Sequence, residues 1–282
     1  MKRIIDVRSI TETVKKLCLS ANFDLPDDVE KSIKKCADVE KSQLCLRALA
    51  QIKDNIEIAR SEEIPLCQDT GIVSVFLELG QEVTISGGQL TEAVNKGVRE
   101  AYGEGYLRKS IVKDPLFDRL NTGDNTPAVI YCDIVAGDKL KIIVMPKGAG
   151  SENMCAIKML KPAEGLQGVE EFILQTVKNA DGNPCPPIFV GVGVGGTMEQ
   201  AALLSKKALA LDLDYKYSDE RYAELAKRLL DRINQLGIGA QGFGGDITAL
   251  GVNILSFPTH IATLPVAVSI NCHAARHKEV IL

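Results

Sequence analysis

The chain has 282 residues, of which 45% are hydrophobic and 25% are charged, enough to bury the core of one large or two modest domains. This composition excludes disordered and collagen-like proteins. A net charge of −4 without a long basic run argues against nucleic-acid binding, and no apolar run reaches membrane-spanning length. We therefore expect an enzyme that acts on small molecules.

The first 64 residues read as helical. Apolar residues recur at helical spacing over residues 8–62, with Ser9 as the expected cap of the first helix and Pro26 just before the second. Asp6 and Arg8 interrupt the first apolar residues, so we expect no secretory signal. Eight cysteines in such a chain then indicate reduced thiols and a cytoplasmic location.

From residue 65 the pattern becomes mixed. Strands are expected at 71–80 and 82–86, before a helix over 90–102. Residues 127–148 alternate between apolar and polar on two arms around Gly137-Asp138, which predicts a β-hairpin. The later predictions are helices at 153–180, 197–210 and 217–236 and strands at 187–194, 247–256 and 264–271.

The predicted fold class is therefore α/β in the sense of mixed α and β, with an N-terminal helical layer followed by a mixed sheet region flanked by helices. Residues 1–64 form the helical region and residues 65–282 the mixed α/β catalytic region. We expect the two regions to make one compact catalytic unit.

Glycine-rich segments suggest anion binding. Gly191, Gly193 and Gly196 match the G-x-G-x-x-G pattern of dinucleotide sites. A second match over 237–242 follows a predicted helix instead of a strand, which shows how easily the pattern arises among 24 glycines. The segment KGAGSEN at 147–153 could equally present backbone N–H groups to a carboxylate or form a tight turn into a helix.

The eight cysteines separate by context. Five fit packing positions in helices or strands: Cys18, Cys36, Cys45, Cys132 and Cys155. Cys67, Cys185 and Cys272 instead stand in turns or at element ends, where thiolates from distant segments could converge on one metal centre. His260, beside a proline and close in sequence to Cys272, is a candidate acid-base or substrate-contacting residue.

A series of short blocks in this order resembles the iron-sulfur hydro-lyase family of class I fumarases and L-tartrate dehydratases, specifically their α subunit or N-terminal half. The resemblance runs through most of the chain. The blocks are CQDTG at 67–71, LRKS at 107–110, NTGDNTPA at 121–128, PKGAGSEN at 146–153, CPP at 185–187, VGGT at 194–197, GIGAQGFGG at 237–245 and the terminal PTHIATLPVAVSINCHAAR.

The resemblance implies a 4Fe-4S cluster held by three cysteines, which match Cys67, Cys185 and Cys272. Three ligands leave one iron without a thiolate, and such an iron can act as a Lewis acid in dehydration. The resemblance also implies catalytic roles for Asp69 and His260.

Three more positions are implied to bind the substrate, a small dicarboxylate. By resemblance they are Gln68, Arg108 and Gly148, of which Arg108 would pair bidentately with a carboxylate. From the residues alone, Asp69 equally fits a turn before Gly71, and Arg108 equally fits a surface ion pair.

Single-chain members of this family continue into a second domain. The resemblance therefore implies a separate β subunit, an α2β2 assembly, and no activity for this chain alone. The expected activity is reversible hydration of fumarate to L-malate, with conversion of tartrate to oxaloacetate as the alternative. Two other readings stay open: a nucleotide-binding oxidoreductase module, and a non-catalytic scaffold subunit whose cysteines only fill the core.

Overall fold

The computed structural model describes residues 3–282 and divides into two compact units. Unit 1 comprises the N-terminal part through Pro26, Ile56–Ala149 and Arg276–Leu282, and unit 2 comprises Asp27–Asn55 and Gly150–Ala275. Helices and a sheet occur in both units, which confirms the mixed α and β class. The predicted change at residue 65 falls inside unit 1, and the helices before it are shared between the units, because a change of sequence texture does not determine which segments pack together.

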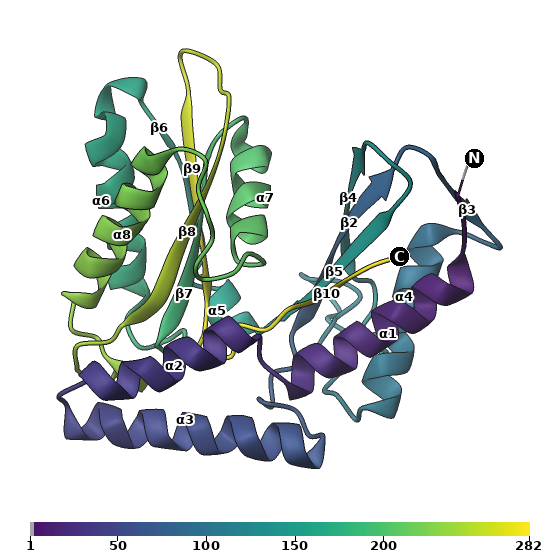
Figure 1. Ribbon diagram of the computed structural model, residues 1–282, viewed down its shortest axis with the longest axis horizontal. Helices are drawn as coiled ribbons and strands as arrows, with labels where there is room; N and C mark the ends of the chain where they lie inside the picture. The colour runs from purple at the N-terminus through teal and green to yellow at the C-terminus, as the bar shows by residue number, and fades with distance from the viewer. Residues whose placement is uncertain (1–2) are drawn as a thin grey trace. The chain divides into compact units, whose positions relative to one another are not determined.

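Unit 1 is built on the four-stranded sheet β10-β5-β2-β4, against which helices α1 and α4 pack (Figure 1). Its elements are β1 (Arg3–Asp6), α1 (Val7–Phe23), β2 (Ile72–Gly80), β3 (Val83–Ser86), α4 (Leu90–Glu104), β4 (Val129–Val135), β5 (Leu140–Lys147) and β10 (Lys278–Ile281). The cap of α1 is Asp6, whose carboxylate accepts the N–H of Arg8 at 2.8 Å. The predicted cap, Ser9, instead donates to the Asp6 carbonyl at 2.7 Å.

The predicted hairpin over 127–148 is wrong. Both arms are strands, but β2 lies between them, parallel to β4 and antiparallel to β5. The connection passes across the end of β2 at Gly80, where a Cβ would lie 2.5 Å from the carbonyl oxygen of Gly137. Alternation predicts the strands and their opposite directions, but it does not reveal a strand inserted between them.

Unit 2 contains the second four-stranded sheet, in the order β6-β9-β7-β8. Helices α6 and α8 cover one face of this sheet and α7 covers the other (Figure 1). Its elements are α2 (Asp27–Val39), β6 (Ala156–Leu160), the 3-10 helix η1 (Pro162–Glu164), α6 (Gly165–Ala180), β7 (Ile188–Gly195), α7 (Met198–Ala208), α8 (Glu220–Asn234), the 3-10 helix η2 (Ala240–Gly242), β8 (Ala249–Phe257) and β9 (Leu264–Asn271). Two helices cross the division between the units: α3 (Gln43–Glu62) and α5 (Ala149–Glu152).

The helix predicted over 153–180 begins only at Gly165. Residues before it form β6, which pairs antiparallel with β9. Pro162 lacks an N–H and stands in η1, so a helix could not run unbroken through this segment. Among residues 3–282, no helix is both long and apolar enough to cross a membrane.

The glycines of the dinucleotide-like pattern have a packing role. Gly191 and Gly193 lie within β7, not in a loop, and face α7. A Cβ on Gly193 would lie 2.0 Å from the carbonyl oxygen of Ala201, and one on Gly191 would lie 2.3 Å from that of Ser205. These residues are therefore explained by the close approach of a helix to a strand, without a bound pyrophosphate.

We predict that Gly193→Ala lowers the free energy of unfolding by at least about 2 kcal/mol, because the added methyl must displace helix backbone. Gly103→Ala is the matched control: Gly103 lies in α4 with open space around its Cβ position, so alanine there should be neutral or slightly stabilising. Urea unfolding of the two variants checks this. Equal midpoints would contradict the packing explanation.

Candidate active site

The CQDTG segment forms a turn before β2 in unit 1, and Asp69 organises it. One carboxylate oxygen of Asp69 accepts the N–H of Gly71 at 3.0 Å, and the other accepts the N–H of Ala149 at 2.7 Å. A Cβ on Gly148 would lie 3.0 Å from this second oxygen. Asp69 thus makes the turn that its sequence position suggested, and it also joins this turn to the glycine loop that follows β5.

Arg108 belongs to the same group of segments. Its carbonyl accepts the Thr70 hydroxyl at 2.8 Å, which fixes the LRKS segment beside CQDTG. Its side chain is exposed, and within residues 3–282 the guanidinium makes no hydrogen bond or ion pair. The surface ion pair considered for Arg108 is therefore not formed, and the guanidinium remains able to bind a carboxylate.

The sequence did not identify Asn125 as a site residue, although it lies in the NTGDNTPA block. Its side chain is fully buried, donates to the carbonyl of Gly71 at 3.1 Å and accepts the N–H of Ser110 at 2.7 Å. Through these two bonds Asn125 holds CQDTG and LRKS together. Only the occurrence of a polar amide in a resembling block hinted at this role.

Arg276 was missed as well. Its buried guanidinium donates from Nη2 to the carbonyl of Asp69 and from Nε to the carbonyl of Pro146 at 3.4 Å. It therefore joins the segments that carry Asp69 and Gly148, and it places a buried positive charge next to them. The available signal was the position of this arginine in the last of the resembling blocks, four residues after Cys272.

Cys185 and Cys272 lie at the same end of the unit 2 sheet. Cys185 precedes β7 and Cys272 follows β9, and the antiparallel register pairs Phe189 with Asn271. The carbonyl of Cys185 accepts the main-chain N–H of His273 at 3.3 Å. The segments that carry Cys185 and Cys272, which lie 87 positions apart in the sequence, are thus in direct contact.

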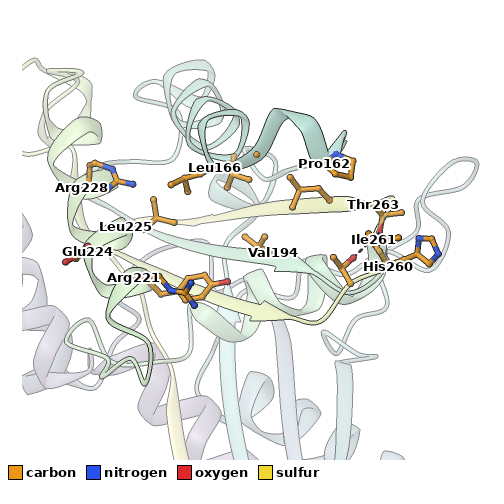
Figure 2. Close-up of a pocket in the computed structure, with 15 residues that line it drawn as sticks. Pro162, Leu166, Val194, Arg221, Glu224, Leu225, Arg228, His260, Ile261 and Thr263 are labelled. Carbon is orange, nitrogen blue, oxygen red and sulfur yellow. Dashed lines mark hydrogen bonds between the residues drawn. The ribbon is translucent and has the colours of Figure 1, made fainter.

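His260 lies at the opposite end of that sheet, in the connection between β8 and β9. The length of β9 places it roughly 25 Å from Cys272 along the strand direction. His260 is exposed, and it borders a cavity of about 680 Å³ between the sheet and helices α6 and α8. Figure 2 shows His260 beside Ile261 at one end of this cavity, with Leu225 of α8 farther along it. The structure therefore does not bring His260 together with Cys185 and Cys272 in one chain.

The eight cysteines differ in exposure. Burial keeps three of them in the core: Cys18, Cys36 and Cys45. It raises the pKa of the Cys36 thiol to about 11, with a further contribution from nearby Glu40, so this sulfur stays protonated. Cys185 is exposed, and Cys67 and Cys272 are partly exposed.

The donor set of Cys67, Cys185 and Cys272 fits an iron-sulfur group, because these are exposed or partly exposed thiols on turns and strand ends. Cys67 belongs to unit 1 and the other two to unit 2. In the described part of the chain, no three histidine, cysteine, aspartate or glutamate side chains form a group that could hold a metal ion. A shared centre for these cysteines therefore stays a prediction.

Comparison with known proteins places the chain in a class. The family model described as "Fumarate hydratase (Fumerase)" matches residues 11–281. The chain belongs to the fumarate hydratase family, and its class is that of the hydro-lyases.

The relatives of this chain are named as α subunits. A protein of Methanocaldococcus jannaschii, provisionally named L(+)-tartrate dehydratase subunit alpha, is 42% identical over 271 residues, which cover 95% of each chain. The L(+)-tartrate dehydratase subunits alpha of Escherichia coli and Shigella sonnei are each 35% identical over 274 residues, covering 96% of this chain and 89% of theirs.

Proposed function

We propose that this chain is the α subunit of a two-subunit class I fumarate hydratase, which interconverts fumarate and L-malate in the cytoplasm. The observation that carries the proposal is the grouping in unit 1 of an unpaired arginine, Arg108, with the CQDTG turn and the Gly148 loop, in a chain matched by the fumarate hydratase family. A β subunit, in an α2β2 complex, would complete the site. Relatives named as α subunits support such a partner.

We assign the substrate carboxylates to Arg108, Gln68 and the Gly148 loop. The planar guanidinium of Arg108 can donate two parallel hydrogen bonds to one carboxylate, which fixes the orientation of a flat four-carbon dicarboxylate. Gln68 is exposed and next to Asp69, so its amide can donate to the same substrate. The buried charge of Arg276 adds an attractive potential for a dianion.

Asp69 is proposed to move the proton on the carbon next to the leaving hydroxyl. The N–H groups of Gly71 and Ala149 fix its carboxylate, and each oxygen keeps a further lone pair that can accept a proton. His260, the second acid-base candidate, would serve such a site only from a second copy of the chain, since its own sheet separates it from Cys185 and Cys272. An α2β2 complex contains that second copy.

Cys67, Cys185 and Cys272 would hold the 4Fe-4S cluster. When bound, such a cluster supplies a Lewis acid for a poor leaving group at an iron that no thiolate occupies.

The alternative substrate is L-tartrate, converted to oxaloacetate: the relatives are named as tartrate dehydratase subunits, whereas the family model is named for fumarate hydratase, so both substrates fit. Fumarate, L-malate and L-tartrate should be supplied anaerobically to the chain alone and to the complex with its β subunit. We expect hydration of fumarate by the complex and none by the chain alone. Turnover of tartrate without fumarate hydration would select the alternative, and full activity of the chain alone would contradict the two-subunit proposal.

A further inference from the structure

The GIGAQGFGG segment at 237–245 has no role in the proposed reaction, yet unit 2 holds it in place through several contacts. The N–H of Ala240 donates to the sulfur of Cys45 at 3.1 Å, and that thiol donates to the carbonyl of Gly244, also at 3.1 Å. A Cβ on Gly245 would lie 2.6 Å from the Cys45 sulfur, so only glycine allows the loop to wrap this side chain. Cys45 is buried as predicted, and in addition it organises this loop.

Glu40 holds the far end of the same loop. Its buried carboxylate accepts the N–H groups of Asp246 at 3.2 Å and Ile247 at 3.1 Å, together with those of Lys41 and Ser42, both at 2.8 Å. Burial acts to raise the pKa of Glu40, but the four N–H groups outweigh it and hold the pKa below its ordinary 4.5.

Glu40 therefore stabilises the fold above pH 4.5, and this contribution is lost as the pH falls through the lowered pKa of the folded state. We predict that Glu40→Gln lowers the midpoint of thermal unfolding at pH 7 by about 5 °C, because buried N–H groups lose a charged acceptor. The loss relative to the unsubstituted chain should shrink below pH 4.5. Thermal unfolding between pH 3 and 7 measures this, and a constant difference would contradict it.

The loop delivers one side chain, Gln241, to the Cys185 turn. Gln241 has a φ of 55°, in the left-handed region that few residues other than glycine and asparagine adopt readily. Its main-chain N–H donates to the carbonyl of Pro186 at 2.8 Å, and its side-chain Nε2 donates to the same carbonyl at 2.9 Å. The unfavourable backbone conformation of Gln241 thus directs two hydrogen-bond donors to one acceptor, the carbonyl of Pro186.

His273 acts on the neighbouring carbonyl. The oxygen of Cys185 lies 3.3 Å from the main-chain N of His273 and 3.0 Å from its ring Nδ1. Because a carbonyl only accepts, the ring bond requires the proton on Nδ1. The Nε2 atom of Gln241 lies 3.2 Å from the same ring atom, so the two side chains are also in contact.

We infer that Gln241 and His273 form a clamp that positions Cys185 and Cys272 as cluster ligands. The carbonyls of Cys185 and Pro186 are each held by two donors, and His273 directly follows Cys272, so the clamp fixes both cysteine segments relative to each other. Partners of this kind behind metal ligands set ligand orientation and typically change metal affinity by about 10- to 100-fold. The inference rests on the proposed cluster, and both residues are positioning residues because neither is assigned to the substrate.

Gln241→Asn in the anaerobic complex tests the clamp. Asparagine tolerates the left-handed conformation and keeps the main-chain bond, but its shorter side chain no longer reaches Pro186. We expect cluster iron to be lost to a chelator about tenfold faster than from the unsubstituted complex, with an altered electron paramagnetic resonance spectrum of the oxidised cluster and an unchanged unfolding midpoint. Gln175→Asn, on the exposed face of α6, is the matched control and should behave like the unsubstituted complex.

Gln241→Glu provides a second variant, because a carboxylate of the same length cannot donate to the Pro186 carbonyl. It should lose iron at least as fast as Gln241→Asn. Iron loss and spectra equal to those of the unsubstituted complex in both variants would overturn the clamp while leaving the proposed function intact. An unsubstituted complex without any cluster would overturn both.

Discussion

Cys185→Ser should deprive the α–β complex of its cluster iron and lower fumarate hydration by about a thousandfold. Lewis-acid assistance to the leaving hydroxyl is worth several kcal/mol, and about 4 kcal/mol corresponds to this factor. Cys185 has a φ of 54°, and serine is close to cysteine in size and leaves the backbone of the turn unchanged, so the loss would come from the missing sulfur. Iron per complex and the initial rate of malate formation, both measured anaerobically, check the prediction.

Cys132→Ser is the control for this experiment. Cys132 is also exposed, but it lies on β4 outside the proposed ligand set, and partial desolvation by the surrounding protein together with neighbouring Asp133 raises the pKa of its thiol. Iron and activity should be unchanged. If Cys185→Ser also kept both, the chain would instead be a scaffold whose cysteines do not bind a cluster.

Arg108→Gln should reduce kcat/KM for fumarate by about a hundredfold, because breaking a close charged pair costs about 3 kcal/mol. Arg108→Lys keeps the charge but cannot donate two parallel hydrogen bonds to one carboxylate. We therefore expect a smaller decrease in kcat/KM, about tenfold, mainly through a higher KM. Steady-state rates over a range of fumarate concentrations separate the two effects.

Arg47 on α3 supplies the matched control, since its side chain is exposed and outside the proposed site. Arg47→Gln should leave both kinetic constants unchanged. Unaltered kcat/KM in both Arg108 variants would show that Arg108 does not bind the substrate. A lowered unfolding midpoint in Arg108→Gln would point to a structural role, which its unpaired side chain does not suggest.

Local sequence patterns predicted much of the secondary structure. The strand expected over 264–271 is β9 with the same bounds, and the helix expected over 197–210 is α7, found at Met198–Ala208. The pattern over 127–148 failed because pairing depends on β2, which comes from an earlier part of the chain. Periodicity describes one segment at a time and does not contain strand order.

Site residues that belong to the motifs of the resembling family could be predicted from the sequence. Residues that act by hydrogen bonding to main-chain groups far away in the sequence were harder to predict. Asn125, Gln241 and Arg276 were missed because their partners, Gly71, Pro186 and Asp69, are 54, 55 and 207 positions away. Their hydrogen bonds go to carbonyl and amide groups, which every residue carries, so no spacing in the sequence marks them.

The position of His260 shows the same limit. The sequence places it 12 residues before Cys272, which suggested a common site. Eight of the intervening residues form β9, however, and an extended strand carries them to opposite ends of the sheet. Residues that are close in the sequence are therefore far apart in the fold.

The most direct test of the account is activity as a function of iron in the anaerobically purified complex of this chain with its β subunit. Iron should be removed stepwise with a chelator and then restored with ferrous ion, while fumarate hydration is measured at each step. We expect activity to fall with the iron removed and to return when iron is restored. A complex that stays fully active without iron would contradict the proposed cluster and its three cysteine ligands.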